Sequence, residues 1–185
     1  MRIGIAALLG AIVIFFWQFA SHMLLPVGTM GFRLPQAEDA VLQSVSAGLP
    51  QAGIYLLPSI DPAKMGDKPT MDAWVAKAKV NPSVFVVVAT PKADPASMGA
   101  ELGTQFVSNL VAAVLVAWVL AATAWGFGAR VTGATAFGVF GWLANILPQW
   151  NWYRFPSDFL VGNLIDQGVG WLLAGVAIAW WLGRR

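Results

Sequence analysis

The sequence contains no cysteine, one histidine and few charged residues. Without cysteine there is no disulfide, thiolate metal ligand, cysteine nucleophile or lipoprotein anchor. A single histidine excludes a metal site with ordinary His/Cys spacing and bis-histidine haem ligation within the chain. Charged residues make up 11% of the 185 residues, against about 25% in a typical soluble domain. This excludes a water-exposed globule, a disordered chain and a nucleic-acid-binding surface, so no nucleic-acid partner is expected.

Apolar residues account for 58% of the chain and gather in four long runs. A helix needs roughly 20 apolar residues to cross a bilayer. The first run is longer than the core of a secretory signal and is interpreted as an uncleaved signal anchor. We therefore predict a membrane all-α fold with four transmembrane helices embedded in the lipid bilayer. The predicted spans are about residues 3–25, 105–127, 131–147 and 159–182.

Arginines next to the spans predict how the chain is oriented. Arg2, Arg130, Arg184 and Arg185 all fall on one side of the membrane if there are four crossings, and no acidic residue shares that side. Positive residues in short loops stay in the cytoplasm. We expect a multi-pass protein of a bacterial inner (plasma) membrane with both termini cytoplasmic.

The segment between the first two spans differs sharply in composition from the rest of the chain. It holds most of the charges and reads as a small extracytoplasmic α+β insertion. Its uninterrupted apolar run Val84–Val88 predicts a strand buried on both faces, by its own helices or by a partner chain. The predicted elements are helix 36–47, strand 53–57, a helix capped by Thr70 and running to residue 79, and strand 84–89. The predicted divisions are 1–25, transmembrane helix 1; 26–104, the extracytoplasmic segment; and 105–185, helices 2–4.

Polar side chains within the spans are all expected in the outer half of the bilayer. Asp166 is the most informative, because an acidic group at that depth is costly and is a functional-site hypothesis by default. We favour the alternative that these groups hold the helices together. By depth, a contact between Gln18 and Asp166 and one between His22 and Asn163 are compatible with adjacent first and fourth spans. The predicted intramembrane polar network comprises Gln18, His22, Asn109, Asn145, Asn163, Asp166 and Gln167, and Ser21 shares a helix face with the first two.

No group of residues in the sequence has the pattern of a catalytic site. There is no phosphate-binding glycine loop and no nucleophile elbow, and no internal repeat of the kind found in secondary transporters. We therefore predict neither enzyme activity nor a metal site, and no cofactor held by this chain alone. Contact with a pigment or haem of a larger complex is left open.

Three short motifs resemble a group of uncharacterised bacterial inner-membrane proteins. They are Gly53-Ile-Tyr-Leu-Leu-Pro58, Trp150-Asn-Trp-Tyr-Arg-Phe-Pro156 and the stretch from Asp166 to Gly175. The resemblance implies bacterial origin and a similar topology, and it implies no activity.

Together these patterns favour a non-catalytic accessory or structural subunit of a larger membrane complex, such as a respiratory or photosynthetic one. Ten tryptophans, small-residue helix faces and a strand that needs a neighbour indicate contact with other membrane-protein subunits. The alternative is a small proton- or cation-coupled transporter that uses Asp166. A sensor is disfavoured because the cytoplasmic loops are short, and a lipid-modifying enzyme has no residue constellation behind it.

Overall fold

The computed structural model describes residues 1–184, and Arg185, used above for the orientation, lies outside the described residues. The chain forms two compact units. We call them the helical unit, residues 1–32 and 95 onward, and the insertion unit, residues 33–94. Each is described by itself.

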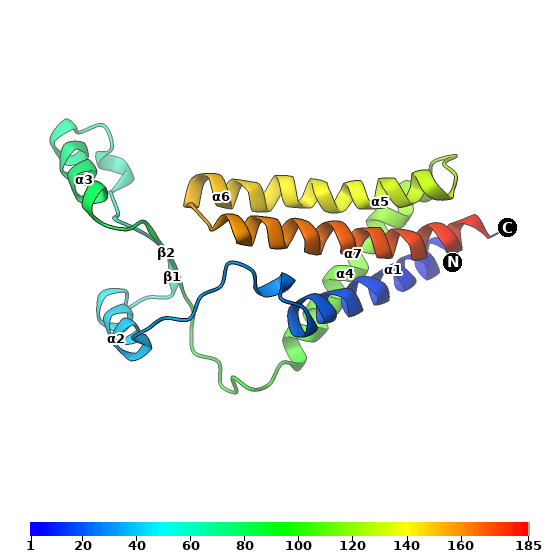
Figure 1. Cartoon of the computed structure of the whole chain (residues 1–185), viewed down its shortest axis with the longest axis horizontal. Coiled ribbons are helices and arrows are strands. Elements are labelled where there is room, and N and C mark those ends of the chain that lie inside the picture. The colour runs from blue at the N-terminus through cyan, green and yellow to red at the C-terminus, as the bar shows by residue number, and fades with distance from the viewer. Residues whose placement is uncertain (185) are drawn as a thin grey trace. The chain divides into compact units, whose positions relative to one another are not determined.

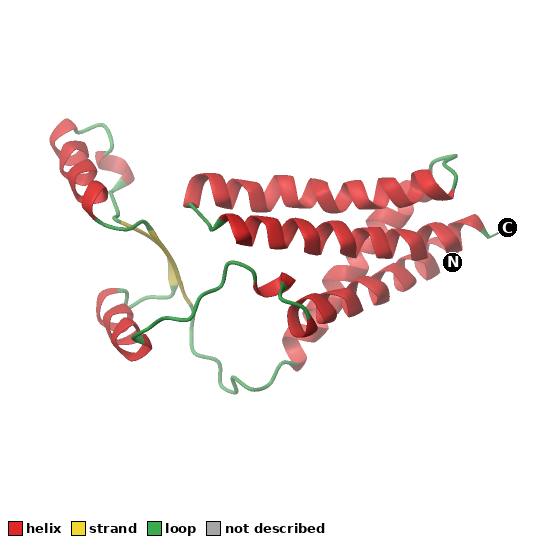
Figure 2. Ribbon diagram, in the orientation of Figure 1, coloured by secondary structure: helices red, strands yellow, loops and turns green. Residues whose placement is uncertain are grey.

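The helical unit contains four helices that are long and apolar enough to cross a membrane, as predicted for a multi-pass membrane protein (Figures 1 and 2). A π-helical turn, Ala20–Leu24, extends the first helix, and another, Trp142–Ile146, joins α5 to α6 so that they form one continuous span. The helices are α1 (Arg2–Phe19), α4 (Gly99–Ala121), α5 (Phe127–Gly141), α6 (Leu147–Tyr153) and α7 (Ser157–Gly183).

The third span is longer than the sequence predicted. It runs over Phe127–Tyr153, 27 residues, rather than over 131–147. Pro148 has no N–H to donate, and a proline inside a helix commonly ends or kinks it. Pro148 lies in the first turn of α6, directly after the π turn, where the Leu147 N–H bonds to the Trp142 carbonyl. A π turn changes the local bonding pattern and lets the helix continue through the proline.

Small residues line the contacts between the helices. α1 packs against both α4 and α7, and α5 packs against α7. A Cβ added at Gly10 would lie 2.7 Å from Ile178, so the missing side chain permits the observed approach. The fully buried alanines are Ala6, Ala7, Ala11, Ala113, Ala117, Ala134, Ala174 and Ala179. Close packing of small residues therefore holds together the part of the helical unit that lacks polar contacts.

The insertion unit has the predicted order of helix, strand, helix and strand. β1 and β2 pair antiparallel, with Gly53 opposite Val88 and Leu57 opposite Val84. The elements are α2 (Glu38–Gly48), β1 (Gly53–Leu57), a 3₁₀ turn (Pro62–Lys64), α3 (Lys68–Val80) and β2 (Val84–Val88).

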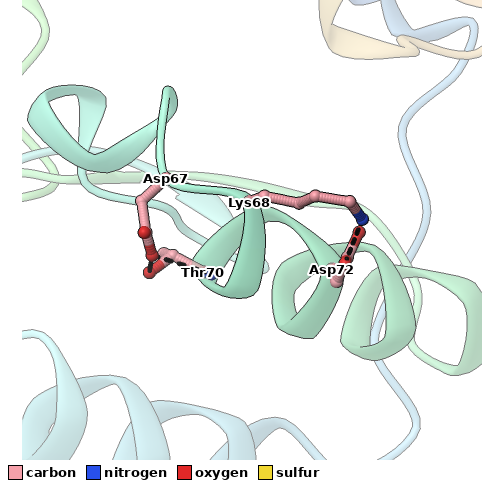
Figure 3. A network of polar contacts seen from close by, with 4 residues as sticks. All are labelled: Asp67, Lys68, Thr70 and Asp72. Carbon is pink, nitrogen blue, oxygen red and sulfur yellow. Dashed lines mark hydrogen bonds and ion pairs between the residues drawn. The ribbon is translucent and has the colours of Figure 1, made fainter.

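The cap of α3 corrects the predicted start of that helix. Asp67, not Thr70, is the N-cap: its carboxylate accepts bonds from the Thr70 N–H at 3.0 Å and from the Thr70 hydroxyl at 2.5 Å (Figure 3). Lys68 pairs with Asp72 one turn later, at 2.7 Å. Aspartate is a favoured N-cap because its carboxylate accepts the N–H of the residue three positions later. Pro69 is also suited to the first turn of a helix, where its missing N–H has no acceptor in any case.

The helices of the insertion unit do not bury β2 on both faces. Val87 is 63% exposed and Val84 is 37% exposed. The structure describes all of residues 33–94, and none of them is buried as the core residues of the helical unit are. The insertion unit therefore leaves much of its two-stranded sheet exposed.

Candidate functional site

A buried hydrogen bond joins the end of α1 to the middle of α7. The Ser21 hydroxyl donates to Oδ1 of Asp166 at 2.5 Å, and the two residues are 0% and 8% exposed. The Trp17 indole N–H donates to the Asp166 backbone carbonyl at 3.0 Å. α1 therefore contacts both the side chain and the main chain of the only acidic residue inside a predicted span.

Two local features make this contact possible. Ser21 lies in the π turn that ends the first span, a type of turn often found at functional positions. Gly170 follows Asp166 by one helical turn, and a Cβ there would lie 2.9 Å from the Trp17 ring. The absence of a side chain at Gly170 lets the indole lie against α7.

His22 extends the polar contacts to the surface of the helical unit. Its Nδ1 lies 3.0 Å from the Gln18 carbonyl oxygen and 2.9 Å from the Ser21 hydroxyl. A carbonyl oxygen only accepts, so the contact with Gln18 is a hydrogen bond in the form of His22 that carries a proton on Nδ1. In that form His22 also donates toward Ser21, whose hydroxyl has two acceptors, the Asp166 carboxylate at 2.5 Å and the Gln18 carbonyl at 3.2 Å. These contacts link an exposed imidazole to a buried carboxylate.

Gln18 links α1 to α4 at the same end of the helices. Its Oε1 accepts a 2.7 Å bond from Nδ2 of Asn109, which is buried. Oδ1 of Asn109 in turn accepts from Nε2 of Gln105 at 3.0 Å. Side chains of α1, α4 and α7 therefore form one polar layer.

The predicted partners within this layer were wrong. Gln18 contacts Asn109 rather than Asp166, and Asp166 contacts Ser21. His22 does not meet Asn163, whose amide donates to the Phe159 carbonyl on its own helix. Depth along a helix gives the level of a side chain but not the neighbour that it faces.

Two further predicted residues lie outside the layer. The Asn145 amide donates to the Gly141 carbonyl one turn earlier on its own helix, at 3.0 Å. Gln167 lies at the contact of α7 with α5, where its backbone oxygen would be 2.6 Å from a Cβ added at Gly138. Neither side chain is brought to Asp166.

Ser21 and Trp17 were missing from the predicted network. Both could have been found from spacing, because they are four residues apart on α1, and Asp166 and Gly170 are four apart on α7. Each pair lies on one face of its helix, so the polar and bulky residues of the first pair can pack against the polar and small residues of the second.

The layer has the residue types of a serine hydrolase triad but not its arrangement. In a triad the histidine lies between the serine and the carboxylate and accepts the serine proton. Here Ser21 lies between His22 and Asp166, and it is fully buried. No group of three His, Cys, Asp or Glu residues that could hold a metal ion occurs among residues 1–184. The layer can fasten helices to each other, and it has no reachable nucleophile.

No protein-family model matches the chain, and comparisons with curated proteins and with solved structures find no similar chain. The function proposed below therefore depends on the site and on the surfaces of this chain.

Proposed function

We propose that the chain is a non-catalytic accessory subunit of a larger membrane assembly, and that its insertion unit binds another protein. The observation that carries this proposal is the open sheet of the insertion unit. Ile54 pairs with Val87 and Leu56 pairs with Phe85, so the four side chains share one face, which we call the ribbon face. Ile54 is 69% exposed and Val87 is 63% exposed.

A two-stranded sheet with an exposed apolar face is marginally stable in water. Both strands are also edges, and an unpaired edge offers N–H and C=O groups to another chain. A partner that covers the ribbon face would remove apolar surface from water, at roughly 25 cal/mol per Å². Binding of a partner therefore explains why these strands are apolar on both faces when the insertion unit itself buries neither.

The polar layer supports a structural role rather than transport. Its members are bonded to one another, and beyond it the contact surfaces of α1, α4 and α7 are built from alanines and aliphatic residues such as Ile178 and Leu120. A proton or cation path needs polar groups across the whole bilayer. The alternative of a transporter retains one supporting observation, the hydrogen-bonded link from His22 to Asp166.

We further propose that the protein lies in a bacterial inner membrane, with both termini cytoplasmic and the insertion unit outside. Arg2, Arg130 and Arg184 support this orientation, because arginines flanking short loops remain on the cytoplasmic side. The position of the insertion unit then limits its partner to extracytoplasmic proteins or protein segments.

Site-specific photo-crosslinking in intact membranes of the native host tests the proposed function. A crosslinking residue in place of Val87 should give one defined protein adduct, whereas one in place of Lys79, exposed on α3, should not. Adding Ile54→Asp should abolish the Val87 adduct, because it places a charge in the covered face. Equal crosslinking from both positions, or none, would contradict the proposal.

A further inference from the structure

Both termini and the α4–α5 turn lie at one end of the helical unit (Figure 1), and Arg2, Arg130 and Arg184 belong to the helix ends found there. Arg2 begins α1, and its guanidinium donates to the carbonyls of Leu182 and Arg184 at the end of α7. Arg130 lies in the first turn of α5, which packs antiparallel to the end of α7. We call Arg2, Arg130 and Arg184 the arginine end.

No described carboxylate neutralises the arginine end. None of the three guanidiniums forms an ion pair with a residue among 1–184. The nine acidic residues lie elsewhere in the chain. On α7 itself, Asp166 precedes Arg184 by 18 residues, which is about 27 Å of helix. Three positively charged residues therefore lie at this end of the helical unit, and no carboxylate among the described residues pairs with them.

Aromatic rings orient one of these guanidiniums. The Cζ of Arg184 lies 3.6 Å from the ring centroid of Trp180 and 5.5 Å from that of Trp181. A stacked guanidinium keeps its N–H groups at its edge, where they are free to bind an anion in a bidentate manner. Tryptophans are also typical of the depth at which lipid headgroups lie.

Two buried N–H donors at this end have no acceptor. They are Nε of Arg130 and Nε1 of Trp181, and they are the only buried side-chain polar atoms without a partner among the described residues. Buried donors are nearly always satisfied in folded proteins, and an unsatisfied one often marks a missing ligand or ion. That both occur beside the uncompensated arginines indicates an absent anionic acceptor.

We propose that the arginine end binds the phosphate of an anionic phospholipid headgroup. A phosphate diester offers oxygens that match the guanidinium fork and supplies the missing negative charge. The exposed apolar residues Leu173 and Val176 lie on α7 within about three turns of Arg184 and can contact the acyl chains. A free phosphate ion would satisfy the same donors but not this apolar surface. The site does not depend on a protein partner of the insertion unit.

Equilibrium binding to the purified full-length chain in neutral, phosphate-free detergent micelles tests the proposal. The probes are labelled phosphatidylglycerol, labelled phosphatidylcholine and inorganic phosphate, each alone. The native chain should bind phosphatidylglycerol about tenfold or more tightly than phosphatidylcholine. Arg130→Gln and Arg184→Gln should each weaken phosphatidylglycerol binding several-fold. Arg154→Gln, which removes one charge at the opposite end of the α5–α7 pair, should leave it unchanged.

Arg184 follows the last residue of α7, so Arg184→Gln interrupts no helix. This variant can therefore still test the proposal if Arg130→Gln fails to fold. Equal binding of the two lipids, or equal losses in Arg154→Gln and Arg184→Gln, would overturn the proposal. Inorganic phosphate that binds as tightly as phosphatidylglycerol would overturn its lipid part and assign the site to a free anion.

Discussion

Ser21 and Asp166, 145 residues apart in sequence, form a 2.5 Å hydrogen bond inside the helical unit. The serine lies in a π turn and the carboxylate in the middle of the longest helix, so the bond fastens the beginning of the chain to its last helix. Asp166 has few alternative partners at this depth. The bond is therefore the most direct place to test what the polar layer does.

Ser21→Ala should destabilise the helical unit by about 1–3 kcal/mol, because it leaves a buried carboxylate oxygen without its donor. The measurement is the SDS mole fraction at which the purified protein loses helicity in mixed micelles. Ser108→Ala makes the same change at an exposed position of α4 and should have no measurable effect. Equal midpoints for the two variants would show that the bond contributes nothing.

Asp166→Asn separates structural from proton-carrying roles. An amide can still accept the Ser21 bond, so folding should survive with a loss on the order of 1 kcal/mol, as for polar contacts between membrane helices. Neither the native protein nor the variant should carry protons or cations when reconstituted in liposomes. Asp166→Leu cannot accept the bond and should lower stability further. A flux in the native protein that disappears in Asp166→Asn would refute the structural role.

Gly138→Ala should destabilise the α5–α7 contact by about 1–3 kcal/mol. The new Cβ would lie 2.6 Å from the backbone oxygen of Gln167 and 2.7 Å from the Trp171 ring, and a backbone atom cannot easily move aside. Gly141→Ala, three residues later at the end of the same helix, meets no atom within 4 Å and should be neutral or slightly stabilising. The same detergent unfolding assay compares them, and the reverse order of stability would contradict the described packing.

Lowering the pH should destabilise the N-terminus of α3, because it protonates the capping carboxylate of Asp67. The hydroxyl of Thr70 first, and then its backbone N–H, hold the pKa of Asp67 below its ordinary value. A carboxyl with a lowered folded pKa stabilises the fold fully above its unfolded pKa of about 3.9 and loses that contribution as the pH falls through the folded pKa. NMR titration of the Asp67 side-chain carboxyl in the full chain measures the shift. Thr70→Val should return the pKa toward its ordinary value, and an unchanged pKa would contradict the cap.

A cysteine introduced at Lys68 should react with a membrane-impermeant reagent only from the extracytoplasmic side. The native chain has no cysteine, so labelling at a single position can be interpreted without background. A cysteine at Gly126, in the α4–α5 turn, is the matched control and should react only from the cytoplasmic side. The opposite pattern would invert the proposed orientation.

Hydropathy and turn residues were sufficient to predict most of the architecture. Four apolar runs identified the spans, and proline, glycine and β-branched residues identified both strands. The third span was predicted too short, and a π turn, which depends on packing, continues the helix up to Pro148 and beyond. Local sequence cannot show such a turn in advance.

The polar layer was predicted in part: Gln18, His22, Asn109 and Asp166 belong to it, whereas Asn145, Asn163 and Gln167 do not, and the predicted pairs were not found. Its residues could be ranked by depth, which depends only on helical rise. Which neighbour each one faces depends on the rotation of the helices, which close contacts such as Gly170 against Trp17 determine. The apolar run at Val84–Val88 predicted burial on both faces, but the insertion unit by itself does not provide a surface that covers it.

The joint that follows the first span has a consequence for the order of biosynthesis. Met30 and the Val27 carbonyl lie against α7 so closely that a Cβ at Gly162 would be 2.8 Å from each, and Gly31, with φ of +90°, crosses beside Phe159. Translation delivers the N-terminal side of this joint long before its seat on α7. Until α7 has been made, Ser21 and this joint therefore lack the partners that they have in the finished helical unit.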